Sequence, residues 1–407
     1  MPMIKRAEFG RRRRKLMQFM GNNSIAILPS NSEQLRSRDT DFQFRQHSDF
    51  HYLSGFPEPQ SVLVLVPGRE QGEFILFCRD RDPKMETWHG RRQGPAGAMK
   101  NYKCDDAFPI DDIDDILPGL MEGRDRIYYE FGNHNEFDNK IMGWINSLRS
   151  QVKNGAHPPG ELIDLSHVLH DMRLFKSSAE IAVMKQVAEL SAKAHNHVMQ
   201  SCAKAKNESD LEAEIKYQFA KKGARFEAYN SIVASGENAC ILHYVENDCG
   251  LNNKDLILID AGAELAGYAA DITRTFPKSG RFSVLQKQAY QWVLKANKEA
   301  IKTVKPGNPW TAPHDTAVRI LTQGLIDMQI LSGELNQLVD EEAYKPYYMH
   351  KTGHWLGLDV HDVGDYLIDK EPRILESGMV LTVEPGLYFA PNTKGLDKKM
   401  VGSWDPY

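Results

Sequence analysis

The feature that most constrains the fold is a pair of short strand-like runs, each next to an aspartate. Apolar residues 256–259 lead into Asp260, and the second run follows Asp271 after a short turn-like segment. Two such runs predict an antiparallel hairpin. If the hairpin is centred between Leu265 and Ala266, Asp260 lies opposite Asp271, and opposed residues point to the same face of a sheet.

This register places two carboxylates side by side and sets Glu264 opposite Gly267 at the turn. Like charges in opposed positions destabilise a sheet, and a cation between them removes the repulsion. In a different register, both aspartates would be solvated residues that flank the turn. The apolar run before Asp260 favours burial, where an unpaired carboxylate is costly, and therefore favours a cation site.

Three histidines, His350, His354 and His361, fall within twelve positions of a chain that has 14 histidines in all. Glycines lie between them and predict an irregular backbone that lets side chains converge. Imidazole nitrogens bind several divalent metals. A lone histidine is more often a hydrogen-bonded core or surface residue, but three in such a segment favour a site.

Glu384 ends an apolar run and is followed by Pro385 and Gly386. Taken alone, it is a glutamate at a strand edge that enters a turn. Taken with Asp260, Asp271 and His354, it completes a set of oxygen ligands with one imidazole, which favours Mn²⁺, Co²⁺ or Zn²⁺. Carboxylates that can bridge suggest two ions, and a two-metal site can activate water and polarise a carbonyl.

Short β-branched runs predict a mixed α/β domain in the N-terminal part of the chain. The segment 157–160, His-Pro-Pro-Gly, breaks this pattern and is a candidate linker. We place the domains at residues 1–172 and 173–407. The predicted N-terminal strands are residues 25–28, 62–66, 74–78 and 127–130.

The second domain is predicted to contain two helices followed by strands, twice over, which suggests two similar halves. Ser177 with Glu180 and Ser209 with Glu212 have capping-box spacing, which is typical of a helix start. The predicted elements are helices that begin at Ser177 and Ser209, strands within residues 229–276, helices near 284–304 and 313–331, and strands up to residue 389.

The composition is that of a globular protein, with 41% hydrophobic and 26% charged residues. A net charge of −5 argues against nucleic-acid binding, and no run of 18 apolar residues predicts a membrane span. Five cysteines without C-x-x-C spacing argue against disulfides and thiolate zinc sites and favour the cytoplasm. The basic residues 11–14 are predicted to be the solvated face of a helix with Phe9, Leu16 and Met20 opposite.

The strings LILIDAGAELAGYAADITRTFP, HWLGLDVHDVG and VLTVEPGLY resemble the metallopeptidase family with the pita-bread fold. Residues 42–56, 88–92, 172–177 and 229–238 are similar to signatures of its bacterial aminopeptidase P (Xaa-Pro aminopeptidase) branch. The resemblance runs from about residue 5 to about residue 395. It implies an α/β (α+β) protein, with an N-terminal domain and a pita-bread catalytic domain of two pseudo-symmetric halves.

The resemblance also implies roles for individual residues. Asp260 and Asp271 match ligands of one ion, with Asp271 bridging, and His354 and Glu384 match ligands of a second ion; both are usually manganese. Glu384 also matches a proton acceptor. By the same resemblance, His243 and His361 hold the substrate and stabilise the tetrahedral intermediate, His350 supports the site from behind, and Tyr229 and Trp88 contact the substrate, Trp88 from a neighbouring subunit in some relatives.

The sequence departs from the family pattern at its C-terminal end. The family has a fifth ligand, a glutamate, after the position of Glu384, and residues 385–407 contain no glutamate. Residues 401–407 lack a strand pattern and are predicted to be a loop or an out-of-frame tail, with terminal strands missing. Lys351 stands where relatives usually have glycine and is expected to point to solvent.

These observations predict a cytoplasmic, proline-specific metalloaminopeptidase that forms homo-oligomers. Its substrates would be peptides with proline at the second position, and its cofactors two divalent ions, Mn²⁺ by resemblance, with the second site weakened by the missing ligand. The alternatives are a prolidase-type dipeptidase and a truncated family member with little or no activity. A nucleic-acid-binding relative is supported only by the basic residues 11–14.

Overall fold

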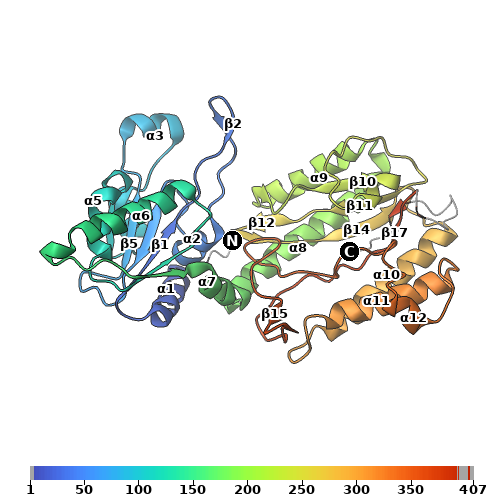
Figure 1. Cartoon of the computed structure of the whole chain (residues 1–407). Coiled ribbons are helices and arrows are strands. Elements are labelled where there is room, and N and C mark those ends of the chain that lie inside the picture. The colour runs from blue at the N-terminus through green and yellow to red at the C-terminus, as the bar shows by residue number, and fades with distance from the viewer. Residues whose placement is uncertain (1–3, 392, 394–401, 404–407) are drawn as a thin grey trace. The chain divides into compact units, whose positions relative to one another are not determined.

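The computed structural model describes residues 4–391, 393 and 402–403, and these form two compact units (Figure 1). One unit is Ile4–Arg173, and the other begins at Leu174. The prediction that residues 157–160 separate the two domains is wrong. After these residues the chain forms another strand of the first unit's sheet, β8 (Glu161–Asp164). No helix in the described part of the chain is long and apolar enough to cross a membrane.

A six-stranded mixed sheet forms the centre of the first unit, in the order β6-β5-β4-β1-β7-β8. All four predicted strands are confirmed. The two outermost strands, β6 and β8, were not predicted, because neither is a buried apolar run. The sheet strands are β1 (Ser24–Pro29), β4 (Val62–Leu65), β5 (Phe74–Cys78), β6 (Asp106–Pro109), β7 (Arg126–Tyr129) and β8 (Glu161–Asp164).

Helices and one hairpin complete the first unit. Its apolar core joins strands of the sheet to two amphipathic helices, α5 (Ile113–Met121) and α6 (Asn135–Ser150). The other elements are α1 (Arg6–Met20), the exposed hairpin of β2 (Leu35–Ser37) and β3 (Thr40–Asp41), α2 (Ser48–Ser54), α3 (Pro83–His89), α4 (Gly94–Gly97) and α7 (Leu165–Leu174).

The basic run in α1 is only partly solvated, which corrects the prediction. Phe9, Leu16 and Met20 are buried as expected, but Arg12 and Arg13 are only 1% and 7% exposed. Arg12 Nη1 donates to the carbonyl of Tyr52 at 2.9 Å, and Arg13 Nη1 to that of Leu53 at 2.7 Å. These carbonyls lie at the C-terminal end of α2, where a helix lacks internal donors and favours cations.

The second unit follows the predicted order of two helices and strands, twice. One core packs α8 (Ser178–Ser201) and α9 (Glu208–Lys221) against strands, and another packs α10 (Val284–Thr303) and α11 (Ala312–Asp327) together. The remaining elements are β9 (Phe226–Glu227), β10 (Ile232–Ser235), β11 (Leu256–Asp260), β12 (Ala263–Leu265), β13 (Tyr268–Ala269), β14 (Thr273–Pro277), α12 (Leu335–Asp340), β15 (Leu367–Ile368), β16 (Glu371–Pro372), β17 (Tyr388–Phe389) and β18 (Gly402–Ser403).

One predicted helix start is confirmed and the other is wrong. Ser177 and Glu180 form the expected capping box at the start of α8. The second box is formed by Asn207 and Asp210, because the Asn207 side chain accepts from the Ser209 backbone and Asp210 reaches back to the Asn207 N–H. The α9 helix therefore begins one residue before Ser209, at Glu208.

The hairpin register differs from the predicted one by two residues. Glu264 pairs with Ala269 instead of Gly267, and Asp260 pairs with Thr273 instead of Asp271. The turn has two residues, Ala266 and Gly267, and both have positive φ, 52° and 85°. Two-residue turns of this kind match the twist of a hairpin, so the chain reverses one residue later than predicted.

The prediction of a loop at 401–407 is wrong for Gly402 and Ser403. These two residues form β18 and pair with β17, with Tyr388 opposite Ser403 and Phe389 opposite Gly402. The remainder of this prediction, Val401 and residues 404–407, lies outside the described residues.

Candidate metal centre

The two aspartates of the hairpin meet even though they are not cross-strand partners. Asp260 is the last residue of β11, and Asp271 lies just before β14. The Tyr229 hydroxyl bonds to Asp260 Oδ1 and lies 3.0 Å from Asp271 Oδ1. One phenol thus spans both carboxylates. The sequence did not predict that Tyr229 would join the two aspartates by hydrogen bonds.

His354 lies between two carboxylates. Its Nε2 is 3.1 Å from Asp271 Oδ2 and 3.2 Å from Glu384 Oε1. Its Nδ1 is 2.9 Å from the carbonyl of Trp355, and because a carbonyl can only accept, Nδ1 carries a proton. When the ring is neutral, Nε2 therefore presents a lone pair toward both carboxylates, which is the arrangement of a metal-binding histidine.

Glu384 is held by two threonines on the segments beside it. The Thr382 hydroxyl donates to Glu384 Oε1 at 2.7 Å and accepts from the His354 backbone N–H at 3.0 Å. The Glu384 N–H donates to the carbonyl of Thr352 at 2.7 Å. His354 and Glu384 are thus fixed on two segments that hydrogen-bond to each other.

Two glycines allow these segments to approach the site closely. A Cβ on Gly262 would lie 1.7 Å from the carbonyl oxygen of Ala270, and a Cβ on Gly353 would lie 2.1 Å from that of Thr382. Any side chain at either position would force the backbones apart. The glycines in the two motifs therefore bring backbones together beside the ligands, rather than simply loosening the chain.

The electrostatics of the cluster fit a cation. Burial and the charge of Asp271 raise the pKa of Asp260 to about 8. Burial alone would lower the pKa of His354, but its hydrogen bonds to Asp271 and Glu384 outweigh burial and raise it to about 10. Without an ion, these acids thus attract protons to balance their charge. The ligand atoms of Asp271, His354 and Glu384 lie within 4.8 Å of one another, as a bound ion requires.

A cavity of about 530 Å³ opens at this cluster. It is lined by the three other predicted histidines, His243, His350 and His361, and by Tyr229. The ring of His361 lies 4.3 Å from that of His354. Burial lowers the pKa of both His350 and His361, so both rings are neutral at neutral pH.

Sequence reasoning missed several residues of the site. Tyr388 lines the cavity and its hydroxyl lies 2.9 Å from His350 Nε2. Thr382 and Tyr388 both belong to the VLTVEPGLY string, so proximity to Glu384 was the available signal. The prediction that Lys351 is exposed is confirmed, although the residue also lines the cavity. Trp88 is not among the residues brought together; it lies on α3 of the other unit and is 76% exposed.

Comparisons with known proteins agree with this geometry. Residues 182–402 match the model of metallopeptidase family M24, and residues 9–128 match that of the aminopeptidase P N-terminal domain. The chain is 43% identical to the Xaa-Pro aminopeptidase of Escherichia coli (strain K12) over 395 residues, which cover 97% of this chain and 89% of the relative.

Solved structures are similar over nearly the whole chain. Pseudomonas aeruginosa aminopeptidase PepP has a TM-score of 0.98 and 52% identity, and the match covers 100% of this chain and 92% of the other. Zinc-substituted E. coli aminopeptidase P in complex with product has a TM-score of 0.96 and 42% identity, covering 99% and 92%. The predicted fold, an N-terminal α/β domain and a pita-bread catalytic domain, is confirmed, and the chain belongs to metallopeptidase family M24.

Proposed function

We propose that this protein is an Xaa-Pro aminopeptidase, which hydrolyses the bond between an N-terminal residue and a following proline. The observation that carries the proposal is the convergence of Asp260, Asp271, His354 and Glu384 on one cavity, which three further histidines also line. Relatives that match nearly the full chain bear that name. Cytoplasmic location and a homo-oligomeric state are parts of the same proposal.

The cluster is suited to two divalent ions, which we propose to be Mn²⁺. Asp260 and Asp271 would hold one ion, Asp271 would bridge, and His354 and Glu384 would hold the other. Bound divalent ions polarise a carbonyl and lower the pKa of water. Carboxylates with a single imidazole are the donor set that Mn²⁺ accepts.

The remaining residues are proposed to handle the peptide and its protons. Glu384 would accept a proton from the water molecule whose oxygen attacks the scissile carbonyl carbon. His243 and His361 donate hydrogen bonds to the carbonyl oxygen, where negative charge develops during the reaction. Stabilisation of such charge by fixed donors is usually the largest single contribution to catalysis. His350 lines the cavity and is proposed to hold Tyr388 in place, since its Nε2 lies 2.9 Å from the Tyr388 hydroxyl. Tyr229 and Trp88 are proposed to contact the substrate, Trp88 from a neighbouring copy.

The test is release of the N-terminal residue from an Xaa-Pro-Xaa tripeptide, with and without added Mn²⁺. His354→Ala is expected to lose at least 10–100-fold in activity, since loss of even an outer partner of a ligand has that effect. Faster cleavage of an Xaa-Pro dipeptide than of the tripeptide would instead indicate a prolidase. Failure of both substrates in the presence of Mn²⁺ contradicts the proposal.

The second ion is proposed to bind more weakly than the first in a polypeptide of these 407 residues, because residues 385–407 supply no further glutamate. Calorimetric titration with Mn²⁺ is expected to show one strong and one weak site per chain. Extension of the polypeptide by a segment that carries the family's glutamate should strengthen the weak site and raise turnover. Equal turnover of the two polypeptides would show that this ligand is dispensable.

A further inference from the structure

The loop that carries His243 follows β10 and spans residues 236–249. After one short helical segment, Gly236–Cys240, it has little regular structure before β11 begins at Leu256. Side chains 241–243 and Val245 line the cavity, and the apolar ones are 40–56% exposed. The position of His243 in the cavity therefore depends on what holds this loop.

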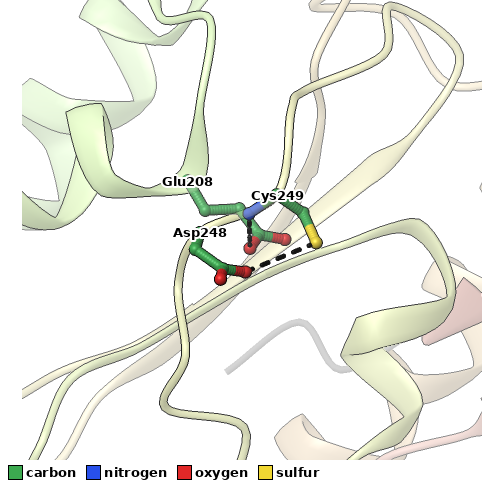
Figure 2. Close-up of side chains that lie close together, drawn as sticks. All are labelled: Glu208, Asp248 and Cys249. Atoms are coloured by element: carbon green, nitrogen blue, oxygen red, sulfur yellow. Dashed lines mark hydrogen bonds between the residues drawn. The ribbon is translucent and has the colours of Figure 1, made fainter.

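A single buried carboxylate holds the loop at both ends. Glu208, the first residue of α9, is fully buried. Figure 2 shows it beside Asp248 and Cys249, with the Cys249 backbone nitrogen pointing at its carboxylate. Its donors are Ser235 N (2.7 Å), Ser235 Oγ (2.7 Å) and Asn238 Nδ2 (3.2 Å) on Oε1, and Tyr244 OH (2.8 Å) and Cys249 N (3.0 Å) on Oε2.

This cluster is a hydrogen-bonded anchor rather than a second metal site. Ligand-type atoms of Glu208, Asp248 and Cys249 lie within 4.8 Å of one another. Both Glu208 oxygens, however, already accept from protein donors. Asp248 and Cys249 are exposed and meet only through a long contact of 3.7 Å between Oδ1 and Sγ. The N-terminus of α9 further stabilises the Glu208 charge.

Asn247 fixes the same loop to the sheet. Its Oδ1 accepts from the Val233 N–H at 2.8 Å, and its Nδ2 donates to the Ser231 carbonyl at 2.8 Å. The side chain thus takes the place of a neighbouring strand beside β10. Between Asn247 and the Glu208 contacts at Ser235 and Asn238, the segment with His243 projects to the cavity.

We infer that Glu208 is a positioning residue, whose carboxylate sets the place of loop 236–249 and, through it, of His243. This inference rests on the proposed peptidase function. Within the described part of the chain, Glu208 forms no hydrogen bond with any of the four proposed metal ligands. Its effect should therefore reach the substrate side of the site and spare metal binding.

Glutamine cannot replace the carboxylate. Each Glu208 oxygen accepts from a backbone N–H, Ser235 on one side and Cys249 on the other, and a backbone N–H cannot turn to become an acceptor. In either amide orientation, the Glu208→Gln side chain therefore places its NH₂ group against a fixed donor. A buried donor left unsatisfied is costly, so the loop should detach at one end.

The experiment compares Glu208→Gln with Asp248→Asn, which removes the same charge from an exposed neighbour. Glu208→Gln is expected to lower kcat/KM on the Xaa-Pro-Xaa tripeptide by about 10–100-fold. Its Mn²⁺ affinity, measured by calorimetric titration, should equal that of the parent protein. Amide hydrogen exchange should become faster in residues 236–249. Asp248→Asn should match the parent protein in all three measurements.

A double-mutant cycle with His243→Ala tests whether Glu208 acts through His243. If it does, Glu208→Gln should have little further effect on kcat/KM in the His243→Ala background, because coupled residues are not additive. Fully additive losses would overturn the inference. So would unchanged hydrogen exchange in loop 236–249, or faster exchange without loss of kcat/KM.

Failure of the proposed function and failure of the Glu208 inference give different results. If the parent protein cleaves no Xaa-Pro peptide, the proposed function fails, while hydrogen exchange still tests whether Glu208 anchors the loop. If Glu208→Gln does not fold, Tyr244→Phe takes its place, since it removes one donor and leaves the carboxylate with its other partners. Tyr244→Phe should then show a smaller change in the same direction, and no change would overturn the inference.

Discussion

Lys176 and Asp362 form a buried ion pair with 2.7 Å between Nζ and Oδ2, and both side chains are 1% exposed. Asp362 directly follows His361, so the pair fixes the backbone beside a cavity residue. The motif at residues 172–177 therefore has a physical explanation: Arg173 pairs with Asp49, Lys176 with Asp362, and Ser177 caps α8.

Lys176→Met should lower the free energy of unfolding by about 3–5 kcal/mol, because it breaks a buried ion pair by removing one of its two charges. The measurement is urea unfolding. Lys193→Met, which breaks an exposed pair with Glu189, is the control and should change stability by about 0–1 kcal/mol. A loss for Lys176→Met as small as that of the control would contradict the prediction.

Because of Asp49, we expect the unit Ile4–Arg173 to lose stability at acid pH. Burial pushes its pKa upward, but Arg173 and His170 outweigh burial and hold the pKa below the ordinary 3.8. A carboxyl with a lowered folded-state pKa stabilises the protein above its unfolded pKa and loses that contribution as pH falls below it. Unfolding measured from pH 6 down to pH 3 should therefore show a steeper acid loss in the parent protein than in Asp49→Asn. Equal slopes would contradict this.

Elements with a strong local signal could be predicted, and those set by tertiary contacts could not. The strands at Ile25, Val64 and Phe77 are buried apolar runs, and Ser177 carries its own cap. In contrast, β8 is mostly exposed and is defined only by pairing with β7. The hairpin register depends on the positive φ of Ala266, and a positive φ cannot be predicted from an alanine in the sequence.

At the scale of elements, Gly353 sets the spacing between two ligand-bearing segments. Gly353→Ala should lower Mn²⁺ affinity and activity by about 10-fold or more, because a Cβ 2.1 Å from the Thr382 carbonyl forces His354 away from Glu384. Calorimetric titration with Mn²⁺ measures this. Gly143→Ala is the matched control, since nothing lies within 4 Å of its added Cβ, and unchanged affinity in Gly353→Ala would contradict the prediction.

Across the whole molecule, the sequence indicated which residue types gather but not how. Paired aspartates and clustered histidines predicted a cation site, and the structure places them on one cavity. The route by which they meet was different, since a phenol spans Asp260 and Asp271 in place of direct pairing. The Glu208 anchor was hidden because its donors are scattered over residues 235–249 and include backbone groups.

Because each unit has its own apolar core, metal should stabilise them unequally. Mn²⁺ at 100 times its dissociation constant adds about 2.7 kcal/mol to the stability of the unit it binds. Calorimetry with Mn²⁺ or with EDTA is expected to shift the transition of the unit that begins at Leu174 and leave that of Ile4–Arg173 in place. Equal shifts of the two would contradict this.

The buried arginines of α1 change how other molecules meet residues 11–14. With Arg12 and Arg13 against the end of α2, the folded protein offers solvent only Arg11 and Arg14 from this run. A receptor that recognises four consecutive cationic side chains therefore finds its epitope only in the unfolded chain. Tryptic cleavage after Arg12 or Arg13 would thus report denaturation of this region.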